Sequence, residues 1–322
     1  MIHAAAARGT GRARRELRRA LLVGVLLAPG AAAAQGLPRS ALAVERNGAW
    51  TPFWRSEQAP ARWTAPHPAL NAAVRWRTLR PGLEHAELRI SGSGEARRLR
   101  VVLVRADPRR LRFRLERATR MQGLLPGWTV DSLPDAAVLA LNAGQFSGAR
   151  PWGWVVRDGR EEQPPGQGPL SMAFVVDGAG GVRLVTADEL PAVRARGGIA
   201  AAFQSYPALL VGDGQVPAQL AAAGRGVDVA HRDSRLALGL LPDGRILVAL
   251  TRFDALGGAV GELPVGPTSP EMAGLMGALG CRRAVLLDGG ISGQMLVRPR
   301  SGAPLAWRAW RRVPLGLVAV PR

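Results

Sequence analysis

Short apolar runs separated by glycine-containing turns recur along the chain from about residue 84 to its end. Residues 170–186 and 234–251 each place a turn signal, DGAGG or PDG, between two such runs, which is the pattern of a β-hairpin. Residues 97–107 and 110–117 alternate apolar and polar side chains, as half-exposed strands do. The chain is therefore expected to build a large, mostly antiparallel sheet system.

One stretch has helical spacing instead. Residues 268–280 carry apolar side chains on one helical face, Thr268 and Glu271 match a capping box, and Gly280 supplies a stop. The sum is an α+β fold, a mixed and mostly antiparallel sheet system with few helices, in a single large domain over residues 84–322. Residues 35–83 are rich in Pro, Trp and Arg with little periodicity, which predicts a linker or wrapping arm.

The first 34 residues have the composition of a signal peptide. A basic stretch at residues 8–19 precedes an apolar stretch at 20–28 and the string AAAAQ, so cleavage is expected near Ala34. The string RRALLV resembles a twin-arginine signal; a general secretory signal and an uncleaved anchor are the alternatives. The apolar stretch is too short to span a bilayer by itself, and no later segment is longer. These features predict a periplasmic or secreted protein.

The formal net charge of +19 comes from arginine alone, since the sequence contains no lysine among its 43 basic residues. The arginines are scattered, with no single-sign run and no aromatic-rich platform, so nucleic acid is not an expected partner. An anionic glycan or a sugar phosphate suits the charge. Cys281 is the single cysteine, which excludes an intramolecular disulfide and predicts a small buried thiol.

Polar residues stand repeatedly where an apolar run ends. Strand ends of a rigid scaffold hold side chains in fixed positions, which makes them good places for site residues. Asparagine or aspartate before glycine also makes ordinary turns, and that alternative stays open for each. Asp288 differs because it follows a full apolar run and precedes two glycines, where the backbone can approach a ligand. The candidates are Asn142, Gln204, Ser205, Arg232, Arg235, Asp288, Gly289, Gly290 and Ser292.

These strings together resemble the phosphodiester glycosidase family over residues 135–320. LNAGQF stands where the family has N-G-G-F-F, and PWGWVVRDGR matches its next glycine-containing segment. FQSYPALLVGDG matches Q-S-G-P-x-L-V-x-x-G, and the strand and hairpin from residue 231 match R-x-x-R-T-A-x-G. Residues 267–295 match the helix E-x-A-x-x-M-x-x-L-G and the string L-D-G-G-G-S-S. The strings occur in the family's order, and the resemblance implies a hydrolase that cleaves a sugar-1-phosphate diester.

The resemblance also implies roles for the residues. Such hydrolysis passes through an oxocarbenium-like transition state that two carboxyl groups usually assist, and paired arginines can stabilise a phosphate leaving group. Asp288 is then the leading carboxylate, and Arg232 and Arg235 are expected at the phosphate. Asn142, Gln204 and Ser292 would orient oxygens of the substrate. The candidates for the second carboxylate are Asp254, Glu271 and Glu262.

Several alternatives stay open at this point. The capping box explains Glu271 structurally, and the two arginines could pair with Asp233 or a neighbouring acid. The family's motifs are altered at Ala143, Gln145, Leu236 and Ile291, so a non-catalytic protein that binds an anionic glycan in the same pocket is the competing function. No cofactor is required by the sequence. Carboxylates could hold a divalent cation, but no histidine has metal-ligand spacing.

Overall fold

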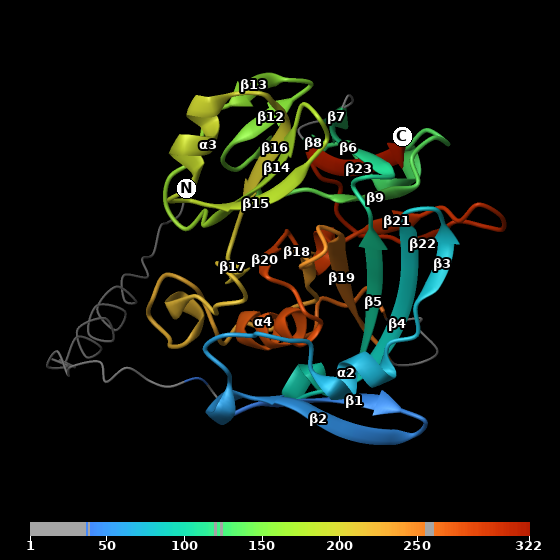
Figure 1. Ribbon diagram of the computed structural model, residues 1–322, viewed down its shortest axis with the longest axis vertical. Helices are drawn as coiled ribbons and strands as arrows, with labels where there is room; N and C mark the ends of the chain where they lie inside the picture. The colour runs from blue at the N-terminus through green and yellow to red at the C-terminus, as the bar shows by residue number, and fades with distance from the viewer. Residues whose placement is uncertain (1–36, 38, 119–120, 123–124, 255–260) are drawn as a thin grey trace, which may run out of the picture. The chain divides into compact units, whose positions relative to one another are not determined.

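A nine-stranded antiparallel sheet forms the centre of the protein, as a computed structural model shows (Figure 1). The structure describes residues 37, 39–118, 121–122, 125–254 and 261–322, so the expected signal peptide lies outside the described residues. In spatial order the strands of this large sheet are β17 (Ala208–Leu210), β20 (Arg283–Leu286), β18 (Leu236–Leu240), β19 (Ile246–Phe253), β5 (Leu99–Ala106), β4 (Leu83–Ser91), β1 (Ala41–Arg46) and β2 (Ala49–Arg55), with β3 (Arg77–Arg80) paired to β4.

Two five-stranded antiparallel sheets lie against one face of the large sheet. The second sheet has the order β13 (Arg160–Gln163), β12 (Val155–Arg157), β16 (Ile199–Ser205), β14 (Met172–Asp177) and β15 (Val182–Thr186). The third sheet has the order β22 (Leu305–Trp307), β21 (Met295–Val297), β9 (Leu139–Asn142), β23 (Leu315–Pro321) and β6 (Leu111–Arg117). Two small ribbons pair β7 (Met121–Gln122) with β8 (Leu125–Pro126), and β10 (Phe146–Ser147) with β11 (Arg150–Pro151).

Helices are few among the described residues: α2 (Pro68–Ala73), α3 (Leu190–Arg196) and α4 (Ser269–Ala278), with short 3-10 turns. This is the α+β fold that the sequence predicted. Both predicted hairpins form, as β14–β15 and β18–β19. The predicted helix forms as α4 with its capping box in place, and Cys281 is buried, which raises the pKa of its thiol. No helix of the described residues is long and apolar enough to cross a membrane.

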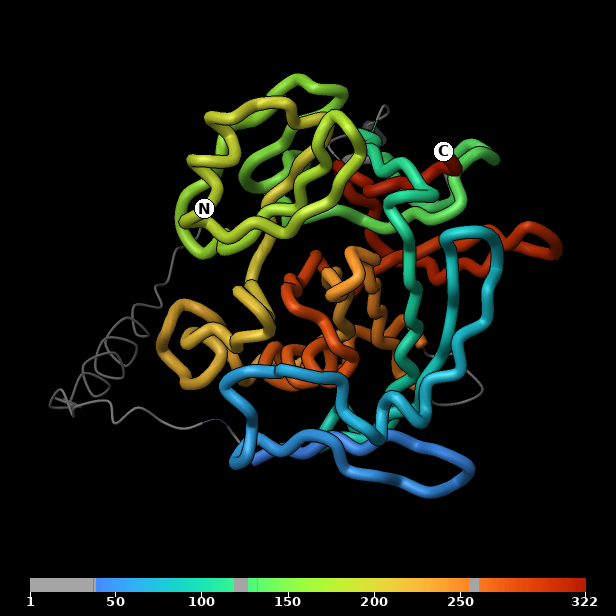
Figure 2. Tube along the Cα trace, in the orientation of Figure 1, coloured from blue at the N-terminus to red at the C-terminus, as the bar shows by residue number. Residues whose placement is uncertain are grey.

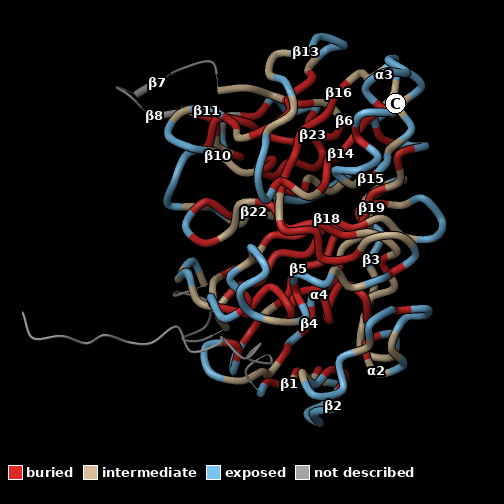
Figure 3. The backbone as a smooth tube through the Cα atoms, turned by 90° about the vertical axis from the view of Figure 1, so that its left-hand side faces the viewer, coloured by how far each residue is buried: buried red, intermediate tan, exposed pale blue. Residues whose placement is uncertain are grey.

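The central strands of the large sheet are buried on both faces, which the alternation of residues 97–107 did not predict. In β5, Val102 and Val104 pack into the core shared with the two five-stranded sheets. Val101 and Leu103 point the other way, into a second core that α2, α4 and the first strands cover. Figure 3 shows the buried segments continuing through both layers. The strand is therefore fully covered, and only its terminal arginines reach the surface.

Residues 41–46, 49–55 and 77–80 form strands of the large sheet, which the expectation of a linker or wrapping arm over residues 35–83 did not include. β1 and β2 form a hairpin, and β1 pairs with β4 through Val44 and Ile90. The turn is Asn47-Gly48, with φ of +53° and +83°, and Asn-Gly is the strongest short hairpin signal. The segment then runs beside α4, as the blue and orange traces in Figure 2 show.

The close packing of this segment explains why α4 is buried on every side instead of on one face. Two glycines of the helix lie under tryptophans of the N-terminal segment. A Cβ at Gly274 would stand 2.5 Å from the Trp54 ring, and a Cβ at Gly277 would stand 2.2 Å from the Trp63 ring. Small side chains at these positions are therefore a packing requirement.

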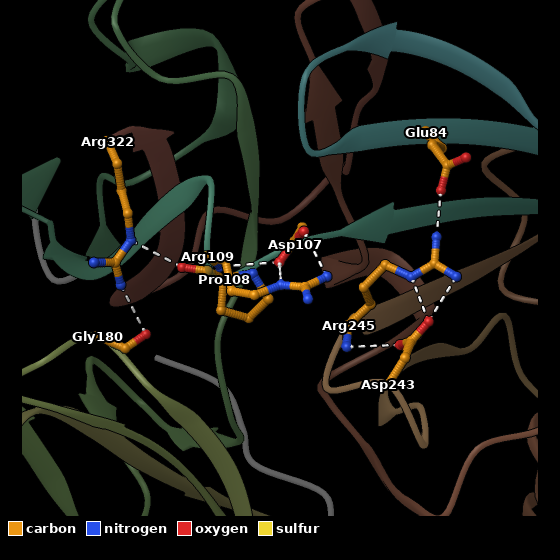
Figure 4. Close-up of polar contacts among 8 residues, drawn as sticks. All are labelled: Glu84, Asp107, Pro108, Arg109, Gly180, Asp243, Arg245 and Arg322. Carbon is orange, nitrogen blue, oxygen red and sulfur yellow. Dashed lines mark hydrogen bonds and ion pairs between the residues drawn. The ribbon is translucent and has the colours of Figure 1, made fainter.

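Arginines tie the turns of the three sheets together (Figure 4). Arg322, at the C-terminus, donates to the carbonyl oxygens of Pro108 at 2.9 Å and Gly180 at 3.0 Å. Arg245 joins the β18–β19 turn to Glu84 of β4 at 2.8 Å. Much of the arginine excess thus serves the fold, since these side chains reach carbonyls and carboxylates across the sheets.

The packing of α4 can be tested with Gly277→Ala. Alanine favours helix, but here its Cβ must displace the Trp63 ring, so we expect a loss of about 1–3 kcal/mol of unfolding free energy. Urea unfolding measures it. Gly178→Ala is the matched control, because a Cβ there meets its nearest atom at 3.7 Å. Equal stability of Gly277→Ala and wild type would mean that the tryptophan does not pack on this helix.

Candidate active site

Asp288 lies where a turn from the large sheet meets the third sheet. It follows β20, and Leu287 still pairs with Leu236 of β18, the N–H donating at 2.8 Å. The side-chain amide of Asn142, at the end of β9, donates to the carbonyl oxygen of Asp288 at 2.7 Å. The Asp288 N–H points at the carbonyl oxygen of Gly144, 3.3 Å away. The carboxylate is thus presented by backbone that two sheets hold on either side.

The two glycines after Asp288 permit a close contact with the strand that enters β18. A Cβ on Gly289 would stand 2.3 Å from the carbonyl oxygen of Ser234. Gly290 has φ of +54°, and a Cβ there would stand 2.6 Å from the Asp233 carboxylate. The Gly290 N–H donates to the Ser234 carbonyl at 2.8 Å. The glycines that the sequence analysis assigned to ligand binding therefore serve first to seat this turn against residues 233–234.

The carboxyl group of Asp288 has an unusual protonation equilibrium. Burial raises its pKa from 3.8 to about 6, and the negative charge of Asp233 adds to the rise. A hydrogen bond from the Ser292 hydroxyl and the positive charge of Arg311 oppose it. The group is therefore ionised at neutral pH but poorly solvated, which is the state expected of a reactive carboxylate.

Asp233 is the second carboxylate at this site. Burial raises its pKa, and its Oδ1 is buried without a hydrogen-bond partner among the described residues. His231 lies 3.7 Å from Oδ2. From the sequence, Asp233 is recognised only as a partner for arginine, because it stands in a polar loop with no motif of its own. The signal that finds it is spatial: its carboxylate packs against Gly290.

Two arginines lie beside the carboxylates without an ion-pair partner among the described residues. Arg235 donates to the carbonyl oxygens of His231 at 2.6 Å and Pro267 at 3.0 Å. Burial lowers its pKa, yet an arginine remains charged at neutral pH. Arg311 is exposed, with its guanidinium 4.7 Å from the centre of the Phe146 ring, and its charge acts on Asp288. Both guanidinium groups can receive an anion. Sequence analysis found Arg235 and missed Arg311.

Arg232 has a different place from the one predicted. Its guanidinium makes two hydrogen bonds to the Glu271 carboxylate, at 2.8 and 2.9 Å. Glu271 is fully buried, caps α4 through the Thr268 N–H, and accepts a hydrogen bond from the Ser40 hydroxyl. Both charges are therefore neutralised inside the protein. The pair stabilises the backbone on which the site is built. Because each charge is already paired, neither Arg232 nor Glu271 is free to bind phosphate or to transfer a proton.

The predicted polar residues at strand ends also have structural partners. The side-chain oxygen Oδ1 of Asn142 accepts a hydrogen bond from the Gln294 N–H at 3.0 Å. The side-chain oxygen Oε1 of Gln204 accepts from the backbone N–H groups of Trp154 at 2.7 Å and Gly166 at 2.8 Å, and the Ser205 hydroxyl donates to a backbone carbonyl of β20. These side chains lock β9, β16 and β20 together. Their predicted contact with substrate oxygens stays a prediction.

The remaining candidates for the second carboxylate are engaged elsewhere. Asp254 forms ion pairs with Arg100 at 3.0 Å and Arg89 at 3.3 Å. Glu262 accepts a hydrogen bond from the Trp310 indole at 2.6 Å. In the described part of the chain no three His, Cys, Asp or Glu side chains gather as metal ligands. The divalent cation stays a prediction, for which Asp233 and Asp288 are the carboxylates at hand.

The fold accommodates the four residues that differ from the family's motifs. Ala143 and Leu236 are buried in the core, and the Gln145 amide donates to the Tyr206 carbonyl at 3.3 Å. Ile291 is 39% exposed, and the neighbouring Gly290 takes the positive φ. The branched side chain therefore costs no backbone strain.

The raised pKa of Asp288 predicts a pH-dependent effect of Asp288→Asn on stability. Between the unfolded pKa of 3.8 and the folded value of about 6, the unfolded chain loses this proton first, so wild-type stability falls as pH rises through that window. Asparagine removes this loss. The variant should gain up to about 3 kcal/mol relative to wild type between pH 4 and pH 7. Urea unfolding at both pH values measures the gain, and a difference that is independent of pH would contradict the desolvated carboxylate.

The buried ion pair predicts that Glu271→Gln destabilises the protein by about 3–5 kcal/mol, because it leaves the Arg232 charge unpaired. Thermal unfolding measures the loss. The double variant Arg232→Met, Glu271→Leu should recover part of it, since no buried charge remains. A Glu271→Gln protein of wild-type stability that has lost its activity would instead make Glu271 a catalytic carboxylate.

A comparison with solved structures finds a similar fold. The catalytic domain of zebrafish N-acetylglucosamine-1-phosphodiester alpha-N-acetylglucosaminidase, auto-inhibited by its pro-peptide, has a similar structure, with a TM-score of 0.54 and 15% identity over 80% of this chain and 91% of that one. A hypothetical protein from Synechocystis gives 0.48 and 16% over 85% and 65%. A putative exported protein from Burkholderia pseudomallei gives 0.45 and 17% over 70% and 74%.

No curated protein sequence matches the chain. The family model of phosphodiester glycosidases, however, matches residues 135–320, more than half of the 322 residues. That range contains Asp288, Asp233 and both unpaired arginines. The chain belongs to the phosphodiester glycosidase family.

Proposed function

We propose that the protein is an exported hydrolase that cleaves a sugar-1-phosphate, that is, a phosphodiester-linked glycoside, in envelope or extracellular glycans. The observation that carries the proposal is the pair of desolvated carboxylates, Asp288 and Asp233, beside Arg235 and Arg311, whose charges act on these carboxylates and which form no ion pair among the described residues. The family's relation to a glycosidase supports the reaction class. Export rests on the signal-like residues 1–34.

The carboxylates and the arginines have different roles in the proposed reaction. Breaking the bond at the anomeric carbon leaves positive charge on the sugar ring and negative charge on the departing phosphate. Arg235 and Arg311 would stabilise the phosphate, which needs little protonation to leave. Asp288, with its pKa of about 6, is ionised at neutral pH and can either accept a proton from the attacking water or attack the ring itself. Asp233 supplies the opposite carboxyl group.

Contacts of the turn after Asp288 hold the two carboxyl groups in position during the reaction. A hydrogen bond from the Ser292 hydroxyl stabilises the ionised Asp288, and the Gly290 N–H, which donates to the Ser234 carbonyl, holds this turn against the loop that bears Asp233. His231 lies 3.7 Å from the Asp233 carboxylate on the same loop. A carboxylate pair positioned by backbone contacts needs little rearrangement when charge develops.

The proposal is tested with a panel of α-N-acetylglucosamine-1-phosphate diesters, using released sugar as the readout, and with the matching 4-nitrophenyl glycoside. Asp288→Asn should lower kcat on both substrates by about 10²–10⁴-fold. Arg235→Gln should lower kcat/KM on the diester by about 10²-fold and much less on the neutral glycoside, because only the diester carries a phosphate for Arg235 to stabilise.

Arg225→Gln is the control, since it removes the same charge from the exposed loop of residues 221–226. Equal losses on the diester and the neutral glycoside would remove the phosphate from the role of Arg235. Diester binding without any release, unchanged in Asp288→Asn, would identify a non-catalytic protein that binds anionic glycans.

A further inference from the structure

A small cavity lies next to the turn that carries Asp288. Its volume is about 190 Å³, less than the roughly 300–1,000 Å³ of pockets for drug-sized ligands, and it has room for a single sugar ring. Strands β5, β19 and β22 contribute its walls. The residues that matter for its chemistry, here called the flanking pocket, are Arg100, Arg252, Phe253, Glu262, Trp307 and Arg308.

Arg252 joins the flanking pocket to the catalytic turn. It is 5% exposed, and its Nη2 donates to the carbonyl oxygens of Gly293 at 2.7 Å and Arg308 at 2.8 Å. Gly293 directly follows Ser292, whose hydroxyl contacts Asp288. The flanking pocket and the Asp288 carboxylate are therefore connected by one short backbone segment, residues 288–293.

The charge of Arg252 has no ion-pair partner among the described residues. The other two arginines of the pocket do have one: Arg100 pairs with Asp254 at 3.0 Å and Arg308 with Asp131 at 3.1 Å. Burial lowers the pKa of Arg252 to about 10, so it stays protonated at neutral pH. The Glu262 carboxylate in the same pocket partly compensates this charge without forming an ion pair with it, so an anion bound at the guanidinium would stabilise the charge further.

The same pocket has the groups that recognise a sugar ring. Trp307 offers an aromatic wall, held by stacking on His85 with ring centres 5.8 Å apart. Glu262 can accept hydroxyl hydrogens, and its other contact is the Trp310 indole, which is 59% exposed. Trp310 adjoins Arg311, which acts on Asp288. The loop of residues 308–311 thus contributes Arg308 to the pocket and the charge of Arg311 to the surroundings of Asp288.

We propose that the flanking pocket binds an anionic sugar unit, one bearing a carboxylate or a phosphate, with the anion on Arg252 and the ring against Trp307. The inference rests on the proposed function: the unit would belong to the same glycan whose phosphodiester bond reaches Asp288. The substrate is then an acidic oligosaccharide or polysaccharide that occupies both sites.

The test is equilibrium binding, which needs no turnover. Glucuronate, glucose 6-phosphate and glucose are titrated into the full chain by calorimetry or saturation-transfer NMR. At least one anionic sugar should bind about tenfold or more tightly than glucose. Arg252→Gln should weaken that binding by about tenfold, and Glu262→Gln should strengthen it severalfold by removing a like charge. Whichever anionic sugar binds more tightly identifies the substituent.

The comparison variants make the outcome decisive. Arg235→Gln, which changes the catalytic site, should leave the affinity unchanged. Binding lost in Arg235→Gln and kept in Arg252→Gln would overturn the proposal, as would the absence of saturable binding by either anionic sugar. If Arg252→Gln does not fold, the gain in Glu262→Gln decides, because a damaged fold cannot produce tighter binding. A protein that cleaves diesters but binds neither sugar would reject this inference alone.

Discussion

The candidate site depends on one close contact between two backbone segments. The turn after Asp288 lies directly on residues 233–234, with the Gly290 N–H bonded to the Ser234 carbonyl and no room for a Cβ on either glycine. This contact brings the two carboxylates together and takes them out of water, which raises both pKa values. Any side chain at Gly289 or Gly290 would separate the pair, so the chemistry and the packing have the same requirement.

The residues that we propose to react differ from the structural ones mainly in carrying a charge that no close ion pair compensates, and less in being polar. Asn142, Gln204 and Ser205 are polar and buried, but each has bonded to backbone that joins two strands. Such bonds hold the strand ends in place, as buried polar groups require. Asp233 and Arg235, in contrast, are largely buried charges that act on each other's pKa but form no ion pair with each other. Because burying them is costly, their presence indicates a ligand of complementary charge.

A feature could be predicted from the sequence when the residues that form it are close together in the chain. The hairpins, α4 with its capping box, and the turn at Asp288 depend on neighbours in the chain, so local patterns were sufficient. The pairing of Arg232 with Glu271 spans 39 residues, and the contact of Asp233 with Gly290 joins two segments by tertiary packing alone. No periodicity encodes such pairs. The β1–β2 hairpin had a local signal, Asn47-Gly48, in a stretch otherwise short of alternating apolar residues.

The N-terminal hairpin therefore has more than a covering role. The segment that packs on α4 also carries Ser40, whose hydroxyl bonds Glu271, and Glu271 in turn holds Arg232 at the start of the loop that bears Asp233 and Arg235. A buried ion pair adds little net stability compared with apolar packing, because both charges must be desolvated. What the pair supplies is position, since the two hydrogen bonds to one carboxylate allow few orientations. The Arg232–Glu271 pair thus holds one side of the loop that carries Asp233, and Gly290 holds the other side. The site needs both contacts to keep the like charges of Asp233 and Asp288 close together.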